Sequence, residues 1–342
     1  MPHRITVQPS GHQFEVEPGN TLLRAALDAG IHLPYGCRNG ACGACKGRVA
    51  SGQVDRGLYT EGALSEADLA KGYALFCCAR PLSDLVIESR EVDRMRDIPV
   101  KTLPCRVQKL TRLAPDVMRL DLKLPASERL QFLAGQYVDI LLKGGRRRSF
   151  SMANPPHADE CLELHVRHVP GGHFTSHVFG AMKERDILRL EGPHGDFHLR
   201  EGGARPIILL AGGTGFAPVK AIVEQAFHQE LGRPMTLYWG ARDRAGLYLH
   251  ALAESWAARH AGFRYIPVLS EPKPDDGWAG RSGLVHRAVM DDFPDLSGHQ
   301  VYACGAPAMI EAARRDLVGQ CGLKDGDFFA DVFTFAAESE NP

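Results

Sequence analysis

The chain has 342 residues, of which 44% are hydrophobic and 24% charged, so it is long enough for two or three domains of a globular protein. Its 40 basic and 41 acidic side chains nearly cancel, which excludes the strong positive field that attracts nucleic acid or anionic membrane. No apolar run is long enough to span a bilayer, and the start has no secretory apolar segment. The nine cysteines, concentrated in a few places, favour metal ligation over disulfides in a reducing compartment. We therefore expect a cytoplasmic protein that binds neither nucleic acid nor membrane.

Residues 1–93 are expected to form a small α+β domain. Two alternating runs in "RITVQPSGHQFEVEPG" predict a hairpin, and "NTLLRAALDAG" predicts a short helix capped by Asn20 or Thr21 and ended by Gly30. A cysteine-rich loop follows, and then a strand in "DLVIESREV". Residues 94–100 are charged and proline-bearing, which indicates a linker.

Two further domains are predicted from the change in pattern along the chain. Residues 101–200 contain short alternating runs such as "VMRLDLKLP", "GQYVDILLK" and "CLELHVRHV", which favour an antiparallel β-barrel. Residues 201–342 alternate between strands and helices, as in "PIILLAGG" followed by "FAPVKAIVEQAFHQ". That alternation predicts an α/β domain with a parallel sheet, so the whole chain is expected to be multidomain.

The loop "YGCRNGACGACKG" places Cys37, Cys42 and Cys45 at the spacing C-x4-C-x2-C, and Cys77 and Cys78 follow about thirty residues later. Three ligands in one loop and a fourth from a distance are typical of a [2Fe–2S] cluster. The loop's glycines allow backbone N–H groups to point at sulfur. A structural zinc site is the alternative, although such sites usually use two C-x2-C pairs and only one is present here.

The cysteine loop and the later "FCCARP" resemble plant-type ferredoxins over most of residues 1–93. The resemblance implies a β-grasp fold and a [2Fe–2S] cluster held by Cys37, Cys42, Cys45 and Cys77. Cys78 is then a packed neighbour of the fourth ligand.

Three stretches of the barrel region, "RRRSFSMANPP", "GGHFTSHVF" and "GPHGDF", together resemble the ferredoxin–NADP⁺ reductase superfamily. The resemblance implies that Arg148 binds the flavin pyrophosphate, that the Phe150 ring packs on the isoalloxazine, and that the Ser151 hydroxyl bonds near its N5. A glycine-rich turn leading into a helix would present amides and a hydroxyl to the same pyrophosphate. The residues of this turn are Gly172, Phe174, Thr175 and Ser176. The resemblance favours FAD over FMN.

"IILLAGGTGFAP" combines a buried strand, a glycine turn and a helix start, which lets backbone approach a pyrophosphate. The spacing is not the G-x-G-x-x-G of an ordinary Rossmann dehydrogenase, and a purely structural turn is the alternative. The superfamily resemblance implies that the turn binds the nicotinamide cofactor. It involves Gly212, Gly213, Thr214 and Gly215.

"ACGAP" resembles the superfamily's C-G-x-P loop beside the nicotinamide ring, which implicates Cys304, Gly305 and Pro307. Relatives that prefer NADPH hold its 2′-phosphate with a Ser-Arg pair. Ala241 replaces that serine before Arg242, which favours NADH over NADPH.

Relatives also cover the flavin with a C-terminal aromatic ring. In "FFADVFTF" the resemblance implies Phe333 for this role, with Phe335 next.

These parts together predict an NAD(P)H-dependent electron-transfer reductase, with Ser151, Cys304 and Phe333 as its catalytic residues. NADH yields two electrons as a hydride and a [2Fe–2S] cluster accepts one at a time, so FAD belongs between them. The exit is an electron-accepting partner protein. The domain order resembles reductase components of ring-hydroxylating dioxygenases and soluble monooxygenases, and still more the CDP-6-deoxy-glucoseen reductases, whose partner is a sugar dehydrase. A zinc-structured binding module without redox activity is an alternative of another class, and a lone NADH oxidase or quinone reductase is a third.

Overall fold

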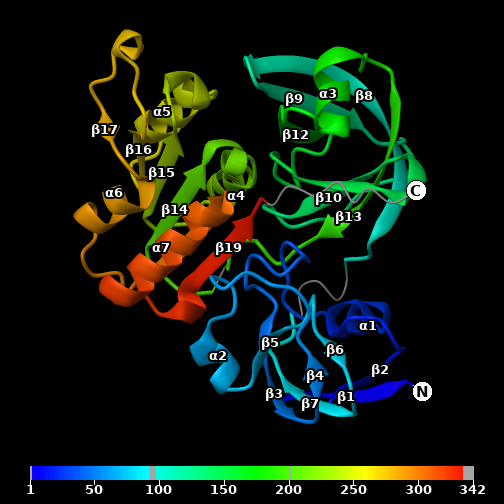
Figure 1. The fold of residues 1–342 in the computed structure, drawn as a ribbon. Coiled ribbons are helices and arrows are strands. Elements are labelled where there is room, and N and C mark those ends of the chain that lie inside the picture. The colour runs from blue at the N-terminus through cyan, green and yellow to red at the C-terminus, as the bar shows by residue number, and fades with distance from the viewer. Residues whose placement is uncertain (1, 93–97, 201, 334–342) are drawn as a thin grey trace. The chain divides into compact units, whose positions relative to one another are not determined.

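The computed structural model describes residues 2–92, 98–200 and 202–333 (Figure 1). By their internal contacts, these residues divide into two compact units. The first unit takes the described residues within 1–99, 195–197 and 330–334, and the second those within 100–194 and 198–329. The expected domain limits at residues 93, 100 and 200 stay predictions.

The first unit is built on a five-stranded mixed sheet of order β2-β1-β7-β3-β5, with a separate pair of short strands, β4 and β6. Its elements are β1 (His3–Gln8), β2 (Gln13–Val16), α1 (Leu22–Asp28), β3 (Lys46–Ser51), β4 (Val54–Asp55), α2 (Glu66–Ala70), β5 (Tyr73–Leu75), β6 (Arg80–Pro81) and β7 (Leu85–Glu88). The predicted hairpin is confirmed, because β1 pairs antiparallel with β2, while its other edge pairs parallel with β7. Thr21 caps α1 by accepting a hydrogen bond from the Arg24 amide, and Gly30 follows the helix with φ +74°. This is the predicted β-grasp arrangement.

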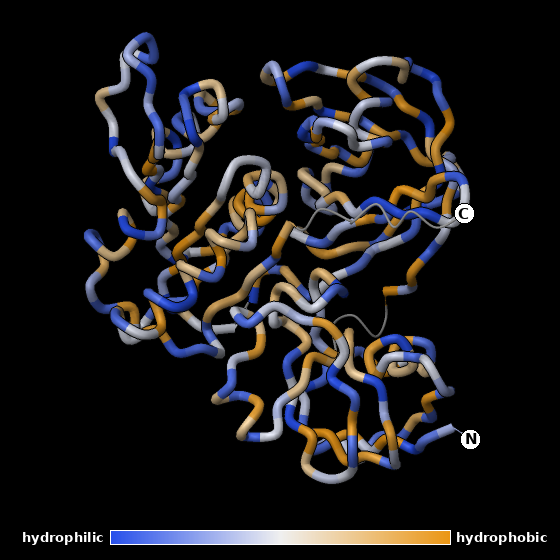
Figure 2. Tube along the Cα trace, in the orientation of Figure 1, coloured by the Kyte–Doolittle hydropathy of each residue, from blue (hydrophilic) through white to orange (hydrophobic). Residues whose placement is uncertain are grey.

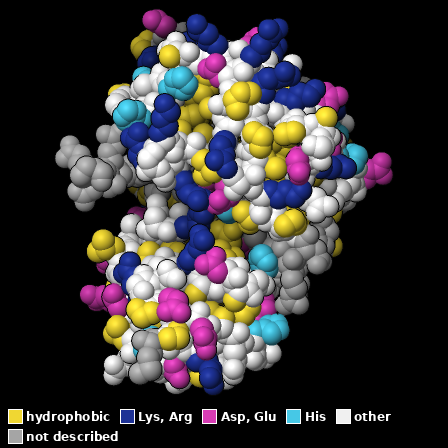
Figure 3. All heavy atoms as spheres, turned by 90° about the vertical axis from the view of Figure 1, so that its right-hand side faces the viewer, with side chains coloured by type: hydrophobic (Ala, Val, Ile, Leu, Met, Phe, Trp, Pro, Cys, Tyr) yellow, Lys and Arg dark blue, Asp and Glu magenta, His cyan; other side chains and the backbone are white. Residues whose placement is uncertain are grey.

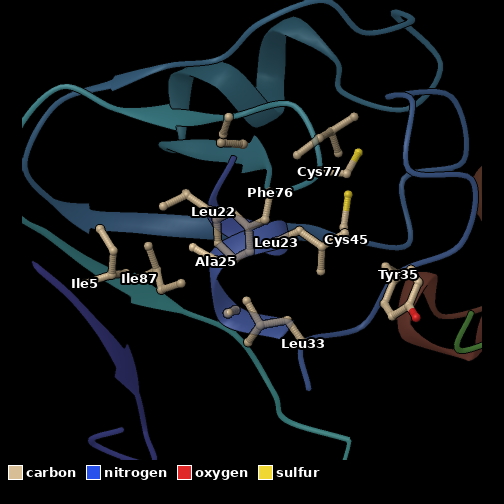
Figure 4. Close-up of a cluster of buried hydrophobic side chains, with 14 of the residues drawn as sticks. Ile5, Leu22, Leu23, Ala25, Leu33, Tyr35, Cys45, Phe76, Cys77 and Ile87 are labelled. Atoms are coloured by element: carbon tan, nitrogen blue, oxygen red, sulfur yellow. The ribbon is translucent and has the colours of Figure 1, made fainter. Parts of the chain in front are cut away.

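The core of the first unit lies between α1 and the sheet (Figure 4). Ile5, Leu22 and Ile87 are fully buried, and burying each such side chain stabilises the fold by about 1.5–3 kcal/mol. Cys45 and Cys77 belong to the same cluster of buried residues. The two cysteines are therefore anchored to a packed core and not carried on an open loop.

The second unit begins with a six-stranded antiparallel sheet of order β11-β10-β13-β8-β9-β12. The elements of this region are β8 (Lys101–Ala114), β9 (Val117–Lys123), β10 (Tyr137–Leu141), η2 (Lys143–Gly145), β11 (Arg147–Ser151), β12 (Leu162–Arg167), α3 (His173–Gly180) and β13 (Ile187–His194). A bridge between Met152 and Leu164 joins the two edges, so the sheet closes into the predicted barrel. Lys and Arg side chains are spread over one outer face of the barrel (Figure 3).

The third large sheet has six strands in the order β17-β16-β15-β14-β18-β19, and it belongs to the second unit except for Ala330–Val332 of β19, which belong to the first. Its elements are β14 (Ile207–Gly212), η3 (Gly213–Gly215), α4 (Phe216–His228), β15 (Met235–Ala241), η4 (Arg244–Gly246), α5 (His250–Arg259), β16 (Phe263–Leu269), η5 (Pro274–Asp276), β17 (Arg281–Ser282), α6 (Val285–Asp292), β18 (Gln300–Gly305), α7 (Pro307–Gln320), η6 (Asp325–Asp327) and β19 (Phe328–Val332). The pairings from β17 to β18 are all parallel, which confirms the predicted α/β architecture. Its central strands are hydrophobic along their length (Figure 2).

The order of these strands reverses at β14, because β15 lies on one side of it and β18 on the other. In open parallel sheets, ligands bind beyond the carboxyl ends of the strands at such a reversal. The glycine turn and the "ACGAP" segment follow β14 and end β18 respectively. Among the described residues, no helix is both long and apolar enough to cross a lipid bilayer.

Candidate functional site

The cysteine loop between α1 and β3 directs backbone N–H groups at sulfur. The amide of Cys37 donates to Sγ of Cys42, and the amide of Ala41 donates to Sγ of Cys37. The amide of Ala44 also donates to Sγ of Cys42, and all three N···S distances are 3.4 Å. Donors aimed at sulfur stabilise thiolate, which is the form that binds metal.

The fourth predicted cysteine meets this loop from the end of β5. The side chains of Cys45 and Cys77 lie next to one another in Figure 4. A hydrogen bond with Cys45 raises the pKa of Cys77, and the nearby charge of Cys37 acts in the same direction. Cys78 is only half-buried, with its Sγ 3.5 Å from that of Cys77. The structure therefore brings the four predicted ligands together and leaves Cys78 beside them.

The electrostatics of the loop favour one thiolate. The side chain of Cys42 hydrogen-bonds to Cys37 and, with the surrounding backbone N–H groups, lowers the pKa of Cys37 to about 6. The same hydrogen bond raises the pKa of Cys42. Four thiols converging around one place, with N–H groups directed at sulfur, fit the donor set of a [2Fe–2S] cluster.

Gly40 shows why the loop needs glycine. Its φ is +79°, and a Cβ there would lie 2.6 Å from the carbonyl oxygen of Leu58. The carbonyl of Gly40 also accepts a hydrogen bond from the amide of Thr60. The loop is consequently held against residues 57–60, and any side chain at Gly40 would separate them.

The first three residues of β11 have different hydrogen-bond and ion-pair partners. Arg147 forms an ion pair with Glu191, and the hydroxyl of Ser149 donates to Asp139 at 2.7 Å. Arg148 alternates with them, is half-buried, and donates to the carbonyl of Arg147 at 2.9 Å. Within the described part of the chain, Arg148 forms no ion pair, so its guanidinium charge is not neutralised by a carboxylate.

The two predicted flavin motifs lie together on the barrel. The rings of Phe150 in β11 and Phe174 in α3 are 5.3 Å apart between centroids, at 46°. Ser151 is buried at the end of β11, opposite Tyr137 of β10. Phe150 packs against the barrel core and Ser151 is buried at its end of the strand, so both side chains are fixed in place.

The hydroxyls of Thr175 and Ser176, at the N-terminus of α3, have different surroundings. The Thr175 hydroxyl accepts a hydrogen bond from the amide of Val169 at 3.1 Å and lies 3.2 Å from the carbonyl of Gly172. A Cβ on Gly172 would lie 2.7 Å from that hydroxyl, which explains the glycine. Ser176 is exposed. The Thr175 hydroxyl therefore shapes the turn, and Ser176 presents its own hydroxyl at the helix start, where N–H groups and the dipole favour a phosphate.

The two predicted nicotinamide segments touch. A Cβ on Gly215 would lie 2.1 Å from the carbonyl oxygen of Cys304, so only glycine fits this crossing. Cys304 is fully buried at the end of β18, followed by Gly305, and Pro307 begins α7. The turn at residues 212–215, here called the glycine loop, includes Thr214 in its short 3₁₀ segment.

Trp239 of β15 holds the glycine loop from the other side. Its Nε1 donates to the carbonyl of Gly213 at 3.0 Å, and its ring stacks on Phe216 at 3.8 Å between centroids. The loop is fixed before any dinucleotide binds, which lowers the entropy lost on binding.

The remaining predicted residues lie just after the ends of strands. Arg242 is exposed directly after β15, whereas a second arginine two residues later, Arg244, donates to the carbonyl of Asp276 at 2.9 Å. Phe333 directly follows β19 and is half-buried, and Phe335 lies outside the described residues. The flavin-covering role of an aromatic ring here stays a prediction.

Sequence reasoning missed a buried polar network in the second unit. Lys220 of α4 lies 3.4 Å from Glu163 of β12 and 2.9 Å from Glu224. His165 bonds through Nε2 to Glu163 at 2.7 Å and through Nδ1 to the hydroxyl of Tyr248 at 2.9 Å. Burial would raise the pKa of Glu163, but the His165 hydrogen bond and the Lys220 charge outweigh it and lower that pKa to about 2. The available signal was a lysine inside the apolar run "FAPVKAIV" and ionisable residues alternating in "LELHVR".

The fold and this donor set define a class, the iron–sulfur flavoprotein reductases. Models of three families match successive parts of the chain. Residues 5–82 match the 2Fe-2S iron-sulfur cluster binding domain, residues 104–199 the oxidoreductase FAD-binding domain, and residues 209–315 the oxidoreductase NAD-binding domain. The cofactors are therefore a [2Fe–2S] cluster, FAD and a nicotinamide dinucleotide.

Known relatives match over nearly the whole chain. A CDP-6-deoxy-L-threo-D-glycero-4-hexulose-3-dehydrase reductase from Yersinia pestis is 42% identical over 97% of this chain and 99% of that relative. Terephthalate 1,2-dioxygenase reductase component 2 from a Comamonas species is 39% identical over 97% of this chain and 98% of that relative. The solved cytochrome P450 reductase from Amycolatopsis has a TM-score of 0.78 at 37% identity and covers 98% of this chain and 100% of its own. The chain belongs to the ferredoxin-fused reductases of the ferredoxin–NADP⁺ reductase superfamily, and it is an NAD(P)H-dependent electron-transfer oxidoreductase.

Proposed function

We propose that the chain passes electrons from NADH, through FAD and its [2Fe–2S] cluster, to a partner enzyme of the sugar-dehydrase kind. The supporting observation is the Yersinia relative, whose name assigns it to a 3-dehydrase and whose 42% identity extends over 97% of this chain. An oxygenase component is the second candidate partner. Its support is the Comamonas reductase component at 39% identity and the similarity to the cytochrome P450 reductase structure.

The cluster ligands in this proposal are Cys37, Cys42, Cys45 and Cys77. Their support is the side-chain hydrogen bonds that join Cys37 to Cys42 and Cys45 to Cys77, together with the amides directed at Sγ of Cys37 and Cys42. The packing of Cys45 and Cys77 in the apolar core would keep water from much of the cluster, and solvent exposure is one of the terms that set a cluster potential.

FAD in this proposal is held by Arg148 and the start of α3. Arg148 supplies a guanidinium that no carboxylate among the described residues neutralises, and Ser176 supplies an exposed hydroxyl beside the helix amides. Phe150 and Ser151 contact the isoalloxazine, and Phe333 covers it. When bound, FAD takes two electrons from the nicotinamide and gives them up singly, so no side chain is needed as general acid or base.

The nicotinamide dinucleotide in this proposal lies over the glycine loop, with Thr214 beside it and Cys304, Gly305 and Pro307 at the ring. The contact between Gly215 and Cys304 supports one continuous surface for the ligand. Ala241 lacks a hydroxyl for a 2′-phosphate, so Arg242 faces the adenosine ribose of NADH.

We also propose a cytoplasmic location and domain limits at 1–93, 94–100, 101–200 and 201–342. None of the nine cysteines forms a disulfide in the structure, which suits a reducing compartment.

The test is an anaerobic titration of the purified protein with NADH, followed by visible spectroscopy and low-temperature EPR. We expect the flavin absorbance to bleach and a rhombic one-electron cluster signal to appear. A colourless protein that contains zinc would contradict the relay and favour a binding module. Adding either purified candidate partner with its substrate then distinguishes the two acceptors, because only the true partner makes NADH consumption continuous.

A further inference from the structure

One face of β12 carries ionisable residues. Leu162, Leu164 and Val166 point into the barrel core, so the alternate residues Glu163 and His165 point the other way, toward the α/β part of the second unit. Both are nonetheless buried, at 6% and 5% exposure. Glu163 pairs with Arg119 of β9 at 3.3 Å within the barrel, and Glu163 and His165 also have partners in the α/β part. These α/β partners connect the flavin motif to the nicotinamide motif.

Lys220 makes the most direct connection. Its ammonium donates to the carbonyl of Ala153 at 3.0 Å and lies 3.4 Å from the Glu163 carboxylate. Ala153 stands two residues after Ser151 of the flavin motif, and Lys220 lies one helical turn after Phe216, which follows the glycine loop. A single buried side chain therefore links the strand proposed for the isoalloxazine to the helix proposed for the dinucleotide.

A second connection runs through His165. A carboxylate can only accept, so Nε2 of His165 donates to Glu163, and Nδ1 accepts from the hydroxyl of Tyr248. Burial lowers the pKa of His165, which suits this neutral form. The Tyr248 ring meets Trp239 edge-on at 5.2 Å between centroids, and Trp239 donates to Gly213 of the glycine loop. Both connections start at Glu163 and end at the loop or its helix.

We propose that Lys220 and Glu163 are positioning residues for hydride transfer, holding the nicotinamide loop in register with the flavin strand. The proposal rests on the proposed ligands of those two motifs. In the reaction, a hydride leaves C4 of NADH with both electrons of its bond and bonds to flavin N5, so NADH becomes NAD⁺ and FAD becomes its two-electron reduced anion. Such transfer needs the two atoms within about 3–3.5 Å, and a misplacement of about 1 Å costs on the order of a hundredfold in rate. The network acts on this distance and not on the affinity for NADH.

The test uses the full-length holoprotein with Lys220→Met, Glu163→Gln and the double variant. Lys220→Met leaves the Glu163 carboxylate to Arg119 and His165, and Glu163→Gln leaves the Lys220 ammonium to Glu224. Each single variant therefore unbalances the charge of a buried network and destabilises the protein, whereas the double variant removes one charge of each sign. Glu163→Gln keeps an acceptor for His165, so it changes charge without removing that hydrogen bond. Four quantities are measured on protein of known FAD content. They are the stopped-flow rate of flavin bleaching, the Kd for NAD⁺, the melting temperature, and amide exchange over residues 212–219.

We expect flavin bleaching to slow at least about tenfold in Lys220→Met and in the double variant, with the Kd for NAD⁺ changed less than about threefold. The melting temperature should fall in the single variants and recover in the double variant. Amide exchange over the loop should be faster in every variant that lacks Lys220. A matched control is Arg129→Met, which removes an exposed ion pair with Asp159 elsewhere in the barrel and should change none of the four.

Two results would overturn the proposal. One is a double variant whose bleaching rate recovers together with its melting temperature, because the network would then serve stability alone. The other is a set of variants that bleach as fast as the parent. Failure of the proposed function is a different observation, since the parent protein itself would then not bleach with NADH.

Discussion

At the scale of the residue, Cys77 and Cys78 are adjacent thiols in different surroundings. Cys77 lies in the core and faces Cys45, whereas Cys78 is half-buried beside Gly57 and Gly40. We predict that Cys77→Ser loses the cluster, because a hydroxyl is a poor ligand for iron, and that Cys78→Ser retains it. Iron and sulfide content, with the EPR signal of the reduced protein, measures this.

The reverse outcome, a cluster lost in Cys78→Ser and kept in Cys77→Ser, would assign the fourth ligand to Cys78. Flavin content is the control for both variants, because a cluster lost by global unfolding would take FAD with it.

At the scale of the element, three consecutive arginines, Arg146–Arg148, lead into β11, and among the described residues only Arg148 combines partial burial with the absence of a carboxylate partner. Arg146 is exposed and donates to the carbonyl of Lys143, Arg147 pairs with Glu191, and Arg148 has no carboxylate partner in the described residues. We predict that Arg148→Ala weakens FAD binding roughly ten- to a hundredfold, since charge-assisted hydrogen bonds contribute about 1.5–3 kcal/mol. Equilibrium titration of the apoprotein with FAD, read by quenching of flavin fluorescence, measures the change.

Arg146→Ala is the matched control, because it removes an equal charge from the residue directly before β11, two positions from Arg148. If both variants lose FAD equally, the total positive charge of this stretch determines FAD binding, and the specific position of Arg148 on β11 does not. If Arg148→Ala keeps FAD as tightly as the parent, the pyrophosphate lies elsewhere.

At the scale of the whole molecule, the cluster and the flavin are carried by separate folds, each with its own core. We predict that Cys42→Ser abolishes reduction of one-electron protein acceptors such as cytochrome c, while NADH bleaches the flavin at the parental rate. Steady-state reduction of cytochrome c and stopped-flow bleaching measure the two halves separately. Loss of both activities together, in a variant that still holds FAD, would contradict a modular relay.

Much of the architecture follows from the sequence because the chemistry is local. The spacing of Cys37, Cys42 and Cys45 within one loop and the alternation along β9, β10 and β12 report directly on ligand geometry and on strands. The network of Lys220 and Glu163 could not be predicted in this way, because its members stand 57 residues apart and meet only after the barrel and the parallel sheet have packed. The difference between Thr175 and Ser176 likewise depends on which hydroxyl bonds to the backbone of the turn, and the periodicity of hydrophobic residues in the sequence does not indicate this.

The hydrogen bond from Lys220 to the carbonyl of Ala153 has a consequence for how the family can vary. Every amino acid supplies a backbone carbonyl, so residue 153 can be replaced by any small side chain that fits its fully buried position without removing the acceptor. Glu163 and Lys220 have no such freedom, because replacing either one alone changes the net charge of a buried network that also contains Arg119 and Glu224. Among relatives, residue 153 can therefore vary without loss of the backbone hydrogen bond, whereas we expect the charged residues at positions 163 and 220 to covary.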